Sequence, residues 1–133
     1  MKVFVDTSAW IALNDKSDQY HNRAAAKSLE IKRQKVELIT SEYIIDESIT
    51  LIRYRVSHYA AVIFGDALFN SSIVKIIDVK DEDRLKAWEI FKKYEDKELS
   101  FTDCTSFAIM EKLKLHKAFT FDEHFKKVGF EVF

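Results

Sequence analysis

Residues 3–8 read Val-Phe-Val-Asp-Thr-Ser, a short apolar run that ends at a carboxylate followed by two hydroxyls. A similar run lies near the other end of the chain, where residues 118–122 read Ala-Phe-Thr-Phe-Asp. Short runs of β-branched and aromatic residues are typical of buried strands. If the two strands are parallel neighbours, Asp6 and Asp122 meet at the carboxyl edge of the sheet, where open α/β sheets place their sites. Each acid also precedes a predicted helix, so a cap or turn is the competing interpretation.

Strands alternate with helices along the rest of the chain. The sequence predicts strands over residues 2–5, 36–40, 74–79 and 117–121, with 130–133 as a candidate edge strand. It predicts helices over residues 7–13, 19–33, 42–56, 59–69, 81–96, 103–115 and 123–128. Thr7 or Ser8 is the expected N-cap of the first helix. This alternation indicates an α/β fold, a three-layer α/β/α sandwich around a mostly parallel sheet of four to five strands.

The composition sets further bounds. The 133 residues suit a single domain over 1–133, and 47% of them are hydrophobic, enough for a packed core. With no proline and only two glycines, the chain lacks the Gly-rich loops that bind nucleotide phosphates. A formal net charge of −1 argues against a protein that binds nucleic acid through its overall charge alone.

Cysteine usage and the start of the chain indicate a compartment. The single cysteine, Cys104, cannot form an internal disulfide, and no basic-then-apolar leader precedes Val3. No apolar run is long enough to span a membrane. We therefore expect a cytoplasmic protein with no membrane association. The histidines show no ligand spacing, and we interpret them as surface or packing residues: His21, His58, His116 and His124.

Two further acids stand beside apolar runs, Glu47 within a predicted helix and Asp103 near the start of another. Asp103 forms a Ser-x-x-Asp capping box with Ser100, which by itself explains an acid in a first helical turn. On a helical wheel Asp46 and Glu47 lie on opposite margins of the apolar stripe, so periodicity does not choose between them. Carboxylates that converge at one sheet edge repel one another unless a cation, most simply a hard divalent ion, lies between them.

At these residues the chain resembles the PIN-domain ribonucleases, in particular the VapC-type toxins of toxin–antitoxin pairs. The resemblance is collinear over essentially the whole chain and rests on residues 3–10, 40–51, 99–108 and 118–125, with 129–130. It implies that four acids hold one or two Mg²⁺ or Mn²⁺ ions, and it selects Glu47 over Asp46. The implied metal-binding and catalytic acids are Asp6, Glu47, Asp103 and Asp122, and the implied supporting residues are Thr7, Ser8, Thr102 and Thr120.

The resemblance also implies the chemistry. It indicates a Mg²⁺- or Mn²⁺-dependent endoribonuclease that cleaves phosphodiester bonds of RNA in accessible or single-stranded loops. Asp6 is the expected direct ligand, Asp103 the next, and Glu47 and Asp122 are expected to act through water. One departure from the family pattern is expected to weaken the binding of a second metal ion. Family members often carry another acid where residues 105–107 here are Thr-Ser-Phe.

The expected partners follow from the same resemblance. A toxin implies a cognate antitoxin protein that lies across the active-site groove, and a homodimer is implied as well. The apolar run over residues 59–69 offers a face for such a dimer, although core packing is the commoner use of such a run. Four basic residues are candidates for phosphate contacts, with a solvated helix face as the simpler interpretation of each: Arg53, Arg55, Lys112 and Lys114.

Three other functions compete with this one. Asp6 is also a conceivable nucleophile for a phosphotransferase, but Ser8 replaces the companion acid usual two residues later. A non-catalytic interaction module is expected to have lost at least one of the four acids, and none is lost. A housekeeping ribonuclease of the same fold shares every residue discussed above, so the sequence does not separate it from a toxin.

Overall fold

Five parallel strands form one sheet in a computed structural model that describes residues 1–133, in the order β3-β2-β1-β4-β5. The strands are β1 (Lys2–Val5), β2 (Glu37–Ser41), β3 (Val74–Ile77), β4 (Lys117–Phe119) and β5 (Glu131–Val132). The predicted sheet is confirmed, with all strands parallel and the candidate edge strand present. The first strand of the chain lies at the centre of the sheet, between β2 and β4.

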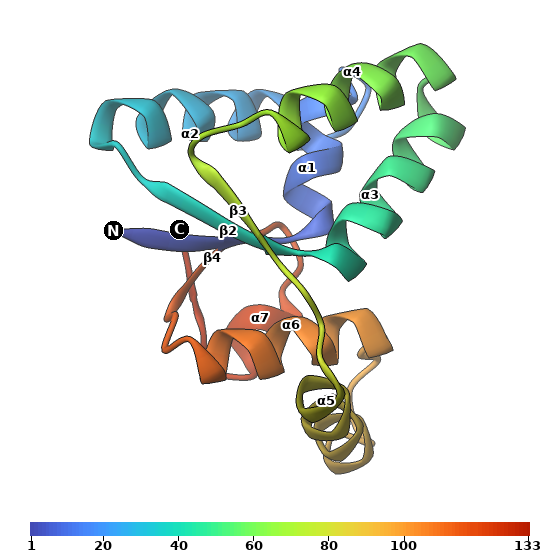
Figure 1. The fold of residues 1–133 in the computed structure, drawn as a ribbon, viewed down its shortest axis with the longest axis vertical. Helices are drawn as coiled ribbons and strands as arrows, with labels where there is room; N and C mark the ends of the chain where they lie inside the picture. The colour runs from blue at the N-terminus through green and yellow to red at the C-terminus, as the bar shows by residue number, and fades with distance from the viewer.

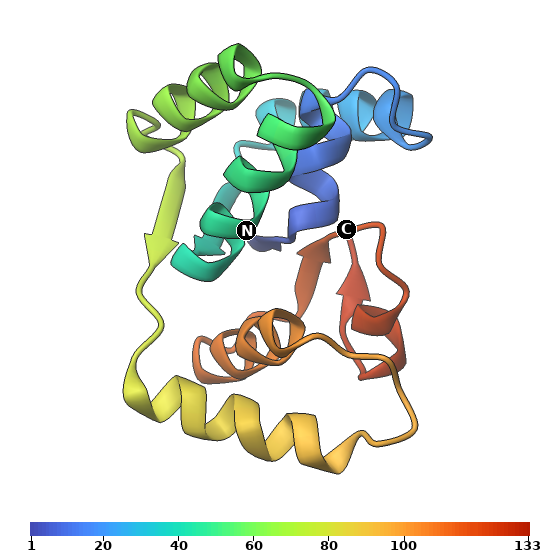
Figure 2. The ribbon, with the colours of Figure 1, turned by 90° about the vertical axis from the view of Figure 1, so that its right-hand side faces the viewer.

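Helices cover both faces of this sheet, as the predicted three-layer sandwich requires (Figure 1). On one face lie α1 (Thr7–Asn14), α2 (His21–Gln34), α3 (Glu42–Arg55) and α4 (His58–Phe69). On the other lie α5 (Asp81–Lys93), α6 (Phe101–Lys112) and the short α7 (His124–Lys127). Figure 2 shows α5 running beneath α6 at the outside of the molecule, joined to β3 by an extended segment.

The neighbouring strands β1 and β4 determine where the strand-end acids lie. Val5 pairs with Phe119 in this parallel ladder, and the backbone N–H of Asp6 donates to the carbonyl of Phe119 over 3.1 Å. Asp6 therefore stands one residue beyond the ladder, at the carboxyl edge of the sheet. Because parallel strands end on the same edge, the segment after Phe119 lies beside Asp6. The sequence predicts this neighbourhood, since it places Asp6 and Asp122 at the same edge of the sheet.

The core holds this edge in place. Val3, Phe4 and Val5 are fully buried, and each buried side chain of this size contributes roughly 1.5–3 kcal/mol to stability. Helix α6 is buried at every position from Cys104 to Met110, because it lies between the sheet and α5. Phe107 of that helix packs edge-on against Phe125, with ring centroids 4.9 Å apart.

Some boundaries differ from the predicted ones. Strand β4 ends at Phe119 rather than at residue 121, because the Thr120 hydroxyl accepts the N–H of Asp122 and the chain turns there. Helix α6 begins at Phe101 rather than at residue 103, since Ser100 is its N-cap. None of the helices is both long and apolar enough to cross a membrane.

Candidate active site

A cavity of about 300 Å³ opens at the carboxyl edge of the sheet, and we call it the acidic cavity. Four of the five carboxylates in its wall come from different parts of the fold: the end of β1, helix α3, the first turn of α6 and the segment after β4. These four are Asp6, Glu47, Asp103 and Asp122, and further lining residues include Thr7, Ser8, Asp18, Tyr20, Arg55 and Phe121. The structure thus brings together the four acids selected from the sequence.

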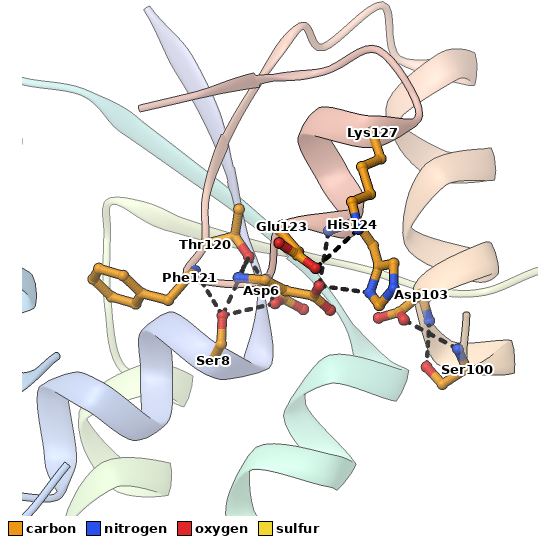
Figure 3. Close-up of polar contacts among 10 residues, drawn as sticks. Asp6, Ser8, Ser100, Asp103, Thr120, Phe121, Glu123, His124 and Lys127 are labelled. Atoms are coloured by element: carbon orange, nitrogen blue, oxygen red, sulfur yellow. Dashed lines mark hydrogen bonds and ion pairs between the residues drawn. The ribbon is translucent and has the colours of Figure 1, made fainter. Parts of the chain in front are cut away.

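Asp6 is the most enclosed of the four acids, with only 4% of its surface exposed. Its Oδ2 accepts hydrogen bonds from the hydroxyls of Ser8 at 2.9 Å and Thr120 at 3.0 Å (Figure 3). Burial raises the pKa of Asp6 to about 7, the two hydroxyls oppose that rise, and the nearby Asp103 and Asp122 add to it. Asp6 therefore occupies a position where positive charge would be strongly favoured.

The two hydroxyls are themselves oriented by the backbone. The N–H of Phe121 donates to Ser8 Oγ over 2.9 Å, and the N–H of Asp122 donates to Thr120 Oγ1 over 3.0 Å. Each hydroxyl accepts one backbone N–H, which leaves its own hydrogen to donate to Asp6. The prediction that Thr7 or Ser8 caps α1 is wrong, because Asp6 occupies the N-cap position and the Ser8 side chain serves the carboxylate instead.

Asp103 combines a structural role with a place in the acidic cavity. Its side chain accepts the N–H of Ser100 at 3.0 Å, while its own N–H donates to Ser100 Oγ at 3.0 Å, the reciprocal capping box predicted from the sequence. Burial raises the pKa of Asp103 despite the bonds with Ser100, and the negative charges of Asp122 and Glu47 raise it further. The cap fixes the carboxylate, and the neighbouring acids make it favour a cation.

His124 joins the acids, which the sequence did not reveal. Its Nδ1 lies 2.7 Å from Asp122 Oδ1, and its backbone N–H donates to the same oxygen over 2.9 Å. Potential ligand atoms of Asp103, Asp122 and His124 all lie within 4.8 Å of one another. The interpretation of His124 as a surface or packing residue therefore has a competitor, a place beside the acids as a candidate metal ligand. Its position two residues after a strand-end Asp, at the start of a short helix, was the available signal.

The helical wheel left Asp46 and Glu47 undecided, and the structure separates them. Glu47 is half-buried and lines the acidic cavity, whereas Asp46 is exposed and lies outside it. Thr7 and Ser8 also line the cavity. Thr102 does not line it, and its carbonyl accepts the hydroxyl of Thr105 over 2.6 Å.

The four basic candidates divide in the same way. Arg55 is exposed and lines the acidic cavity. Arg53, two residues earlier, has its Nη1 2.7 Å from Nδ1 of His58 and lies outside the cavity wall. Lys112 pairs instead with the buried Asp83, at 2.7 Å. Lys114 follows the end of α6 with a left-handed backbone at φ 56°.

The donors around the acidic cavity suit a hard divalent cation. Mg²⁺ and Mn²⁺ prefer carboxylate and hydroxyl oxygens, and five carboxylates line this wall. The hydroxyl of Thr7 is buried there without a hydrogen-bond partner. A buried polar atom is rarely left unpaired, so this oxygen fits a hydrated ion in the cavity. The residues that can hold such an ion are Asp6, Glu47, Asp103 and Asp122, with His124 beside them.

Known proteins are similar in sequence to this chain over almost its full length. Residues 3–131 match the PIN domain. The chain is 37% identical over 128 residues to the 23S rRNA-specific endonuclease VapC20 of Mycobacterium tuberculosis, covering 96% of this chain and 95% of that protein. It is 30% identical over 127 residues to a VapC ribonuclease of Archaeoglobus fulgidus, covering 94% of this chain and 80% of that protein.

Solved structures show the same fold. The crystal structure of Mycobacterium tuberculosis VapC20, described as a sarcin–ricin loop cleaving toxin, superposes with a TM-score of 0.87 at 34% identity and covers 96% of this chain and 95% of its own. VapBC2 from Rickettsia felis, at 14% identity and a TM-score of 0.72, shares the fold. Sequence, topology and the acidic cavity agree: the chain belongs to the PIN-domain family.

Proposed function

We propose that this protein is a divalent-metal-dependent endoribonuclease and the toxin of a toxin–antitoxin pair. The observation that carries the proposal is the convergence of Asp6, Glu47, Asp103 and Asp122 on one cavity at the carboxyl edge of the sheet. Membership of the PIN family and 37% identity to a curated rRNA endonuclease support it. The alternative of an aspartyl phosphotransferase is disfavoured, because Ser8 provides a hydrogen bond to Asp6 where a companion acid would stand.

The roles of the acids follow from how each is held. Asp6 is the main metal ligand, since two hydroxyls fix its Oδ2 and burial favours a bound cation. Asp103 is the second, fixed by its capping box. Glu47 and Asp122 orient water around the site. When bound, Mg²⁺ or Mn²⁺ supplies positive charge to the scissile phosphate and makes the attacking water more acidic.

We further propose a ribosomal RNA loop as the substrate. The relative VapC20, at 37% identity, is named a 23S rRNA-specific endonuclease, and its crystal structure is described as that of a sarcin–ricin loop cleaving toxin. An open cavity at a sheet edge suits an exposed loop, since side chains cannot reach into the deep groove of an A-form duplex. A ribosomal target also implies that the protein acts in the cytoplasm.

Protein partners complete the proposal. A toxin requires an antitoxin, which in this protein would neutralise the acidic cavity. For a homodimer, α4 offers the predicted apolar face, because part of the 59–69 run is buried and part is exposed. The exposed apolar side chains on α4 are Tyr59, Val62, Ile63 and Phe69.

Cleavage of a sarcin–ricin hairpin RNA by the purified protein tests the function. We expect strand scission with Mg²⁺ or Mn²⁺, none with EDTA, and none from Asp6→Asn. The Asp46→Asn variant is the matched control, because it removes an exposed acid next to Glu47 that lies outside the cavity. Equal cleavage by wild type and Asp6→Asn, or cleavage that survives EDTA, would contradict the proposal.

A further inference from the structure

An aromatic pair stands at the rim of the acidic cavity. The rings of Tyr20 and Phe121 are stacked, with centroids 4.7 Å apart and planes within 2° of parallel. Both residues line the cavity, and both are only half-buried. Tyr20 comes from the loop before α2 and Phe121 from the residue before Asp122, so the pair joins two segments far apart in sequence. In Figure 3 the Phe121 ring points away from the carboxylates.

Both rings are held in place through their own backbone. The N–H of Tyr20 donates to Asp18 Oδ1 over 2.8 Å, and the N–H of Phe121 donates to Ser8 Oγ over 2.9 Å. The next residue, His21, has its Nδ1 2.7 Å from the carbonyl of Ala12, which ties the loop to α1. The pair is therefore preorganised, and a ligand that used it would not bear the entropy cost of ordering it.

A guanidinium completes the group. The Cζ of Arg23 lies 5.4 Å from the ring centroid of Tyr20 and 5.3 Å from that of Phe121, so it sits beside both rings. Arg23 is exposed, and no carboxylate lies within ion-pairing distance of it. Its charge is free to meet an anion from solution.

Phe121 lies between two cavities whose side chains carry opposite charge. On the far side of that ring lies a second cavity of about 470 Å³, which we call the basic cavity. Arg23 and Lys27 line it, and its single acidic side chain, Glu30, already pairs with Lys27 at 3.2 Å. Phe121 lines both cavities. One wall therefore separates a site for a cation from a site for an anion.

We propose that Tyr20, Phe121 and Arg23 form a nucleotide-binding subsite that holds one unstacked base of the RNA, and its phosphate, beside the bond to be cleaved. RNA held in single-stranded form is recognised by bases stacked on aromatic rings and on Arg guanidinium groups, together with cationic contacts to phosphates. Here the two aromatic rings can stack on a base, and the adjacent Arg23 can contact a phosphate. The inference rests on the proposed ribonuclease function and adds to it a specificity subsite outside the four acids.

Binding can be measured apart from cleavage. Fluorescein-labelled sarcin–ricin hairpin RNA is titrated with protein carrying Asp6→Asn, which blocks scission, and Tyr20 is changed on that background. Tyr20→Leu is expected to raise Kd roughly 5- to 150-fold, the range of one base–aromatic stack, while Tyr20→Phe keeps most of the affinity. In the cleaving protein, Tyr20→Leu should raise KM more than it lowers kcat.

Arg23 gives a second and independent arm. Arg23→Gln is expected to reduce the slope of log Kd against log salt concentration by about 0.7, the value for one phosphate contact in single-stranded nucleic acid. Arg33→Gln is the matched control, since it removes the same charge from an exposed position on the same helix outside both cavities. Trp88→Leu is the control for Tyr20→Leu, because Trp88 stacks on Phe91 in α5, away from the cavity.

The possible outcomes separate this subsite from the ribonuclease function. If wild type cleaves the hairpin while Tyr20→Leu and Arg23→Gln bind as their controls do, the subsite is overturned and the ribonuclease stands. If Tyr20→Leu unfolds, as circular dichroism would show, the exposed Arg23 arm decides alone. If wild-type protein neither binds nor cleaves the RNA, both proposals fail together.

Discussion

The hydroxyl of Thr120 donates to Asp6 Oδ2 over 3.0 Å, although 114 positions separate the two residues in the chain. The bond crosses from the end of β4 to the end of β1 at the edge where the acids meet. Because the Asp122 N–H occupies the other side of this hydroxyl, Thr120 connects two of the four acids. It therefore positions the site without lying in the cavity wall itself.

Removing that hydroxyl should weaken the site without unfolding the protein. We expect Thr120→Val to lower metal affinity or kcat roughly 10- to 100-fold, the usual effect of losing a group that orients a metal ligand. Thr120→Ser keeps the hydroxyl and should retain most activity. Isothermal titration with Mn²⁺ and the rate of hairpin cleavage measure the two quantities. An equally large loss in Thr120→Ser would contradict this role, because that variant keeps the hydroxyl that donates to Asp6.

The raised pKa of Asp6 predicts how metal-free stability depends on pH. Its pKa is 3.8 in the unfolded chain and about 7 in the fold, so the folded state binds the proton more tightly. This contribution to stability is fully present below about pH 4 and is lost as pH rises through about 7. In EDTA, the unfolding free energy of Asp6→Asn should therefore rise relative to that of wild type between pH 5 and 8, by on the order of 2–4 kcal/mol.

Urea unfolding of both proteins at several pH values measures this difference. Adding Mg²⁺ at pH 8 should then stabilise wild type more than Asp6→Asn, since the variant lacks the carboxylate proposed as the main metal ligand. A wild type whose stability runs parallel to that of the variant from pH 5 to 8 would show that Asp6 is already charged in the metal-free fold.

His124 is predicted to support Asp122. Its Nδ1 lies 2.7 Å from Asp122 Oδ1, and potential ligand atoms of His124 and Asp103 lie within 4.8 Å of each other, so His124→Ala removes a direct partner of Asp122 next to Asp103. We expect Mn²⁺ affinity to fall roughly 10-fold or more, as for other groups that orient metal ligands. His116→Ala is the control, because His116 is exposed and outside the cavity. Identical titration curves for the two variants would show that His124 plays no part in metal binding.

How far the sequence predicts this site depends on whether the signal is local. Asp6 and Asp122 were identifiable because each follows a strand, and Asp103 because its capping box lies within four residues. The roles of Ser8 and Thr120 were only partly accessible, because their bonds depend on β1 lying next to β4. The Tyr20–Phe121 stack has no local signal at all.

Helix geometry explains the remaining ambiguities. Asp46 and Glu47 both flank the apolar stripe, and only the approach of α6 to α3 decides which carboxylate faces the acids. Helix α6 shows little amphipathic pattern, because seven consecutive residues from Cys104 to Met110 are enclosed from both sides. Its start was nevertheless predicted within two residues from Ser100 and Asp103.

Lys112 is expected to matter for stability and not for RNA. Its ammonium lies 2.7 Å from the carboxylate of Asp83, which is almost fully buried and also accepts the N–H of Lys80. Lys112→Met leaves that buried charge without its cation, so we expect a loss of about 1–3 kcal/mol in unfolding free energy. At a temperature well below the melting point, kcat/KM on hairpin RNA should be unchanged. A fall in kcat/KM with normal stability would instead indicate an RNA contact.

Arg55 should show the opposite behaviour. It is the only one of the four predicted basic candidates that lines the acidic cavity, and it is exposed there with no carboxylate within ion-pairing distance. A free guanidinium at the mouth of a cavity with five acids can hold RNA phosphate where the carboxylates would otherwise repel it.

We therefore expect Arg55→Gln to lower kcat/KM roughly 5- to 50-fold and to reduce the salt slope by about 0.7, with unchanged unfolding free energy. Arg53→Gln removes the same charge from the same helix, at a side chain that contacts His58 rather than the cavity. It should have a much smaller effect on either RNA measurement. If Arg53→Gln and Arg55→Gln lose the same activity, the effect comes from the overall charge of α3, and the cavity position of Arg55 carries no special role.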